Sequence, residues 1–228
     1  MRAVERANFT AHAMTIGTIL TAKAMLSADF KADLARAEAD AERGLAHAVE
    51  HRLPQYEAWC SASRGIAMLQ QGDPRQALEA IKAGIAMAET IGSAWGASTR
   101  AGHLAAAHAK AGDPAAALKV LDTAIAQADT TEERFFEAEL HRIRGEILIA
   151  HGNRGAGEMA LQSALSVARR QQARLWELRA ATRLARLWDE EGRRADAREL
   201  VAPVYGSFTE GFDTQDLKEA KALLDALS

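Results

Sequence analysis

The 228-residue chain is poor in residues that cross-link or interrupt a fold: it has one cysteine, Cys60, and four prolines. A single cysteine excludes an internal disulfide framework and is typical of proteins in a reducing compartment. No residue near Cys60 in the sequence would lower its pKa, which disfavours a role as a reactive nucleophile. We therefore expect Cys60 to be a small, buried apolar residue and the protein to be cytoplasmic.

The sequence also lacks an excess of basic charge and a long apolar run. Its net charge is −3 and its pI is near 6.2, so it lacks the basic surface that nucleic-acid binding requires. The apolar stretch 14–26 is interrupted by threonines and Lys23. This stretch is too polar to span a membrane, and it has no signal-peptide cleavage pattern. We expect neither nucleic acid nor a membrane as a partner.

Aromatic residues are scarce as well, at 5% of the chain, whereas alanine is plentiful and 48% of all residues are hydrophobic. Such a composition is typical of a globular protein and is neither disordered nor fibrous. Plentiful alanine suits helices that pack closely over small side chains. The composition therefore favours a helical protein with a substantial core.

No complete nucleotide-binding motif is present. Gly152 and Gly157 have the spacing of a phosphate-binding P-loop, but Glu158 and Met159 occupy the positions of its lysine and its serine or threonine. A carboxylate repels phosphate, and a thioether is a poor magnesium ligand. The sequence therefore keeps the spacing of the motif without its chemistry.

A metal site could begin with His47 and His51, which lie four residues apart and would share one face of a helix. No third ligand is evident, and the glutamate that follows the first histidine in zinc proteases is absent. No serine–histidine–aspartate or cysteine–histidine constellation is evident either. We therefore expect no metal, no cofactor and no catalytic residue, and we predict that the chain is not an enzyme.

The strongest pattern in the chain is a repeat of forty residues. Glycine recurs at this interval, as Gly72, Gly112, Gly152 and Gly192. A mostly polar position follows, occupied by Asp73, Asp113, Asn153 and Arg193, and two of these precede a proline, Pro74 or Pro114. Gly-Asp-Pro ends one helix with a residue that tolerates positive φ, and begins the next with an N-cap carboxylate and a proline at the first helical position. Each glycine therefore predicts a tight turn between two helices.

Each repeat predicts one helical hairpin. Small residues five positions after each glycine let the two helices approach, and aliphatic residues four positions further fill the seam: Ile81, Leu121, Leu161 and Val201. We expect a single domain over 1–228, with hairpins at about 3–51, 54–91, 94–130, 132–171 and 174–204. The segment 203–213 is expected to be a connector, and 214–226 a helix that caps the array.

The spacing of small and aliphatic residues resembles the tetratricopeptide repeat (TPR). Gly65, Gly72, Ala77, Ile81 and Gly84 match that pattern in one unit. Common TPR units have 34 residues, whereas these have 40, a length that HEAT repeats also reach. The Gly-Asp turn and the series of small residues fit TPR better than HEAT. The resemblance implies an all-α, right-handed superhelical solenoid of about five hairpins with a capping helix.

The C-terminal half has a second resemblance. The segments ERFFEAELHRIRGEILI and WELRAATRLARLW look like the C-terminal TPR region of bacterial signalling proteins that carry an adenylate or guanylate cyclase domain and an AAA-type ATPase. This implies a non-catalytic sensor or scaffold region whose partners include the attached ATPase or cyclase. The alternatives are a stand-alone TPR adaptor, a scaffold that associates with further copies of itself, or an enzyme with an unrecognised pocket between hairpins.

A TPR array usually binds partners through the concave face lined by the first helix of each hairpin. Carrying over these repeat positions predicts a groove formed by Trp59, Ile66, Leu69, Glu139, Arg142, Glu146, Arg179, Thr182, Arg186 and Asp189. The hypothesis is an apolar N-terminal half and a charged C-terminal half, suited to a peptide or domain surface that has an apolar anchor and a carboxylate. In the alternative, the charges pair along the helices and the apolar residues belong to the core.

Overall fold

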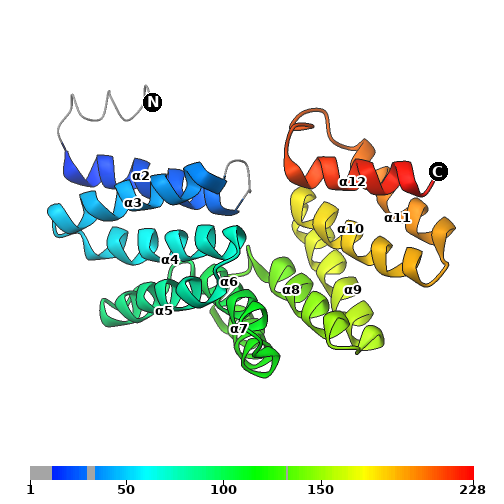
Figure 1. Ribbon diagram of the computed structural model, residues 1–228, viewed down its shortest axis with the longest axis horizontal. Helices are drawn as coiled ribbons and strands as arrows, with labels where there is room; N and C mark the ends of the chain where they lie inside the picture. The colour runs from blue at the N-terminus through cyan, green and yellow to red at the C-terminus, as the bar shows by residue number, and fades with distance from the viewer. Residues whose placement is uncertain (1–11, 30–33, 132) are drawn as a thin grey trace. The chain divides into compact units, whose positions relative to one another are not determined.

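The computed structural model describes residues 12–29, 34–131 and 133–228, and in this part of the chain every regular element is an α-helix (Figure 1). The helices are α2 (Ala13–Asp29), α3 (Leu34–Glu50), α4 (Pro54–Gln71), α5 (Pro74–Thr90), α6 (Ala97–Lys110), α7 (Pro114–Thr131), α8 (Glu137–Ala150), α9 (Arg154–Gln171), α10 (Arg174–Glu190), α11 (Arg194–Gly206) and α12 (Gln215–Ala226). The chain divides into two compact units, Met1–Gly112 (unit 1) and Asp113–Ser228 (unit 2). None of these helices is long and apolar enough to cross a membrane.

The repeated glycines form the predicted turns. All four adopt the left-handed conformation, with φ of 98° at Gly72, 90° at Gly112, 83° at Gly152 and 80° at Gly192. Asp73 then caps α5, since its carboxylate accepts a hydrogen bond from the backbone N–H of Gln76 at 3.1 Å. The prediction that each glycine ends one helix and precedes the next is confirmed.

In unit 1, each helix packs against its neighbours in sequence, so that α2, α3, α4 and α5 lie in successive rows (Figure 1). The helix α4 also contacts α2 and α6, so the first helices of the hairpins lie side by side. One close approach between α4 and α5 is at Gly65, where an added Cβ would lie 2.9 Å from the carbonyl oxygen of Ala77. The small side chain of Ala77 and the aliphatic Ile81 are fully buried in this seam.

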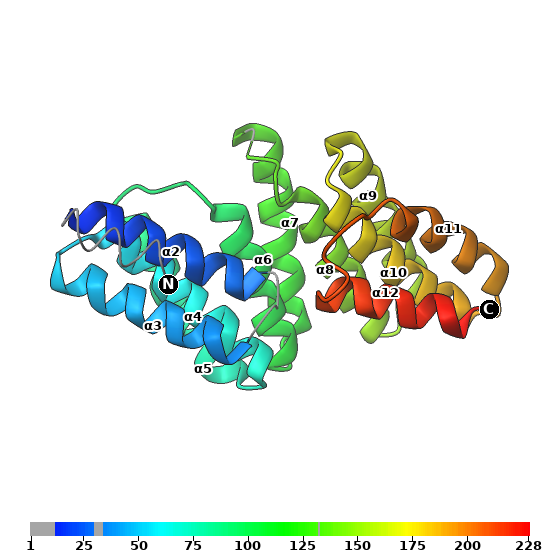
Figure 2. The same cartoon turned by 90° about the horizontal axis from the view of Figure 1, so that it is seen from above.

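In unit 2, the first helices α8, α10 and α12 also lie side by side. The core contains Leu161, Leu178, Leu184 and Val201, all at most 1% exposed. The helix α12 packs against α10 and α11, as Figure 2 shows from a second direction. Leu217 and Ala220 of α12, and Leu227 just after its end, are buried in this core. The predicted terminal helix is therefore present, and it covers the end of the core as a cap.

The all-α array of helical hairpins is confirmed. The described helices lie within the predicted hairpin ranges to within a few residues, whereas 3–11 and 30–33 of the first range and residue 132 of the fourth lie outside the described part of the chain. One boundary differs, because α11 continues through Pro203 to Gly206 and so enters the expected connector. Because the chain divides into two compact units, a single domain over 1–228 stays a prediction.

Candidate functional site

In unit 1, the first helix of each hairpin contributes to one common face, which we call the first-helix face. This face has a shallow hollow. The hollow has a volume of about 310 Å³, including its open side. It is lined by Met25 of α2, by four residues of α4 and by three residues at the start of α6: Met25, Trp59, Ala62, Ser63, Ile66, Gly96, Thr99 and Arg100. The α4 residues recur at intervals of three or four, which places them on one side of that helix.

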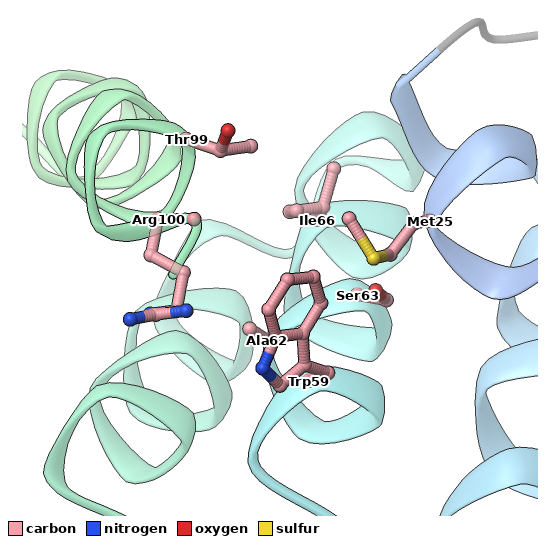
Figure 3. Close-up of a pocket in the computed structure, with 8 residues that line it drawn as sticks. Met25, Trp59, Ala62, Ser63, Ile66, Thr99 and Arg100 are labelled. Atoms are coloured by element: carbon pink, nitrogen blue, oxygen red, sulfur yellow. The ribbon is translucent and has the colours of Figure 1, made fainter. Parts of the chain in front are cut away.

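Figure 3 shows how the walls of this hollow are arranged. Thr99 and Arg100 come from the α6 side, Met25 comes from the α2 side, and the indole ring of Trp59 lies between them. In the lining, Ser63 and Thr99 carry hydroxyl groups, and Arg100 carries the one ionisable group. The hollow is therefore mainly apolar, with a few polar groups at its edge.

The loop Ile91–Gly96 holds a second tryptophan at the hollow. Gly92 and Gly96 have φ of 66° and 71°, so both glycines permit turns that most residues disfavour. Arg100 fixes the loop by donating hydrogen bonds from its guanidinium to the carbonyl oxygens of Trp95 at 2.7 Å and Ser93 at 3.4 Å. As a result, the ring of Trp95 stacks on that of Trp59 with centroids 3.3 Å apart, although Trp95 itself is 61% exposed.

Two polar atoms in this hollow have no hydrogen-bond partner in the part of the chain that the structure describes: Trp59 Nε1 and Thr99 Oγ1. Both side chains are only 5% exposed, and neither atom is accessible to water. A buried hydroxyl or N–H without a partner costs roughly 1–3 kcal/mol, because it loses its hydration and gains no bond. The hollow therefore contains unused hydrogen-bonding capacity.

The equivalent face of unit 2 carries a network of ion pairs, which we call the charge ladder. It consists of four arginines and four acids on α8, α10 and α12: Arg142, Arg179, Arg183, Arg186, Glu139, Glu146, Asp216 and Glu219. Arg142 binds Glu139 through two hydrogen bonds of 2.9 and 3.0 Å, and Arg179 binds Asp216 in the same bidentate manner at 2.8 and 2.9 Å. The ladder therefore has as many positive as negative charges.

Arg142 shows how strongly these charges are coupled. Burial alone would lower the pKa of its guanidinium, but the charges of Glu139 and Glu146, together with their hydrogen bonds, raise that pKa by more than burial lowers it. Arg179 is shared between Asp216 and Glu139, whose oxygen lies 3.6 Å from it. A partner carboxylate at either arginine would have to compete with acids of the chain itself.

The two faces use the same repeat position in different ways. Trp59, Thr99, Glu139 and Arg179 follow one another at intervals of forty residues. In unit 2, Glu139 and Arg179 from neighbouring first helices form an ion pair. In unit 1, Trp59 and Thr99 from neighbouring first helices line one hollow, and each has a polar atom without a partner in the described part of the chain. The polar groups at this repeat position therefore pair with each other in unit 2, whereas in unit 1 they have no partner among the described residues.

The predicted groove residues fall into three environments. Trp59 and Ile66 line the hollow, whereas Leu69 is 4% exposed and packs in the core with Ala77 and Ile81. Glu139, Arg142, Glu146, Arg179 and Arg186 belong to the charge ladder. Thr182 is buried with its hydroxyl unpartnered among the described residues, and Asp189 pairs with Arg194 at 3.1 Å. Whether any of these residues binds a partner stays a prediction.

Met25, Arg100, Asp216 and Glu219 were not predicted. The spacing of Asp216 and Glu219 on the last helix could have indicated a charged face toward α10, because Arg179 and Arg186 share a face of that helix. Met25 carries no comparable signal, because the N-terminal repeat lacks the Gly-Asp turn that sets the register elsewhere.

Cys60 and His47, which were considered for catalysis and for metal binding, make contacts that stabilise the helix packing. Cys60 is fully buried and forms a 3.3 Å hydrogen bond with Thr21, and burial raises the pKa of its thiol despite that bond. His47 contacts the carbonyl oxygen of Ala13 through Nε2 at 2.8 Å. Within residues 12–29, 34–131 and 133–228, no three histidine, cysteine or acidic side chains come together as a metal site would require.

The P-loop-like segment is also explained by packing. Gly152 forms the helix turn, and an added Cβ at Gly157 would collide with Ile149. Glu158 accepts hydrogen bonds from the indole N–H of Trp188 at 2.7 Å and from Arg193 at 3.1 Å. The carboxylate that replaces the P-loop lysine therefore ties α9 to the next hairpin.

Solved structures that are similar to this chain include two that are described as nearly identical TPR-like repeats of a kinesin light chain from Podosopora anserina. One, a point variant, has a TM-score of 0.57 and 16% identity, with 83% of this chain and 92% of the other covered. The second has a TM-score of 0.57 and 15% identity, with 95% and 98% covered. No protein-family profile and no curated protein matches the chain. At these identities the likeness concerns the fold alone, which is a TPR-like helical repeat.

Proposed function

We propose that this chain is a non-catalytic scaffold that binds a protein partner through the first-helix face of unit 1. The TPR-like fold supports a role in protein–protein interaction, because repeat arrays present extended surfaces rather than enclosed pockets. The single observation that carries the choice of face is the exposed Trp95, held in place beside a hollow in which Trp59 Nε1 and Thr99 Oγ1 have no partner among the described residues. Tryptophan in a preformed setting is the residue type most often found at the energetic centre of protein interfaces.

The charge ladder of unit 2 is a weaker candidate for binding. Its arginines already have carboxylate partners at hydrogen-bonding distance, and α12 supplies two of those partners. A ligand carboxylate would gain one ion pair and break another, so the net free energy of binding would be small. Within this proposal, the ladder serves to hold α8, α10 and α12 together.

A peptide-display experiment tests the proposal. Random peptides are selected on the wild-type chain, and their affinities are then measured by calorimetry for wild type and for Trp95→Ala. Truncation of a central anchor costs about 2 kcal/mol or more, so we expect affinity to fall by about thirtyfold. Arg186→Ala, in the ladder, is the matched control and should leave the same affinities unchanged. Peptides that bind Trp95→Ala as tightly as wild type would rule out this face.

The cellular role is a separate proposal, supported by the resemblance of the C-terminal half. There the chain is the C-terminal sensor or scaffold region of a bacterial signalling protein with an ATPase or nucleotide cyclase domain, and it acts in the cytoplasm. The intact mass of the native polypeptide tests this directly. A native product much longer than 228 residues is expected, whereas a native chain that begins at Met1 would favour the alternative of a stand-alone adaptor.

A further inference from the structure

We draw no further inference here: the strongest candidate, the outward face of α2 on which Met14 and Leu26 are exposed, carries nothing because no contact in the described part of the chain shows what covers it.

Discussion

Trp95 covers one face of Trp59, and the two rings are only 23° from parallel. The pair combines a buried residue with an exposed one, since Trp59 is 5% and Trp95 61% exposed. Gly96 allows this approach, because a Cβ at that position would lie 3.3 Å from the ring of Trp59. An exposed indole is thus fixed in orientation without being buried, which lowers the entropy that a partner must remove on binding.

Trp95→Ala should reduce stability only slightly. The exposed ring buries little area, so the main loss is the stacking itself, about 0.5–1.5 kcal/mol. Phe135→Ala in unit 2 is the control, because Phe135 is 52% exposed and contacts Phe136 edge-to-face. Urea denaturation should give losses of similar size for both variants, while only Trp95→Ala loses affinity for displayed peptides. A loss above about 3 kcal/mol for Trp95→Ala would mean that this residue supports the fold.

Two glycines of unit 2 should respond in opposite directions when changed to alanine. At Gly145 an added Cβ would lie 2.8 Å from Leu161 Cγ and 3.0 Å from the carbonyl oxygen of Gly157, so Gly145→Ala should lower the free energy of unfolding by about 1–3 kcal/mol. At Gly155 nothing lies within 4 Å. There Gly155→Ala should raise stability by about 0.5–1 kcal/mol through its higher helix propensity. Chemical denaturation followed by circular dichroism measures both; stabilisation by Gly145→Ala would contradict the close packing of α8 on α9.

Asp216→Asn should loosen α12. The change keeps the shape of the side chain but removes the charge that Arg179 pairs with at 2.8 Å, and both side chains are only 11% exposed. We expect a loss of about 1–3 kcal/mol and faster amide hydrogen exchange within Gln215–Ala226. Asp225→Asn breaks an exposed ion pair with Lys221 on the same helix and should change exchange little. Equal exchange in the two variants would show that the buried pair does not hold α12.

Cys60 should make stability fall at alkaline pH. Burial raises the pKa of its thiol above the ordinary value of 9.0, so the thiol ionises more readily in the unfolded chain than in the folded one. The stabilisation is therefore complete below about pH 9 and is lost as pH rises through the folded-state pKa. Comparison of the free energies of unfolding of wild type and Cys60→Ala between pH 7 and pH 11 isolates this contribution. A difference that does not decrease with pH would contradict it.

The helix turns could be predicted from the sequence because their chemistry is local. Gly72 needs only a residue that tolerates positive φ, and Asp73 caps a helix that begins one residue later. The same locality explains why the capping helix was recognised from its apolar spacing alone. Such features do not depend on which distant segments become neighbours.

The candidate site could be predicted only in part, because its main features depend on contacts between hairpins. Trp59 and Ile66 follow from the repeat register, but the position of Trp95 depends on the loop before α6 and on hydrogen bonds from Arg100. The partner of Arg179 is equally distant in sequence, since Asp216 lies 37 residues away. Repeat spacing identifies which side a residue faces, whereas its partner is set by the neighbouring hairpin.

The interval of forty residues also constrains how this array can change in length. Glu139, Arg179 and Glu219 occupy the same repeat position in three successive first helices, so the sign of the charge alternates along unit 2. Deletion of one hairpin would bring Glu139 beside Glu219, and duplication of one would place two like charges next to each other. Loss or gain of two hairpins at a time would preserve the alternation of charge. We therefore expect the number of repeats to change in evolution by two more readily than by one.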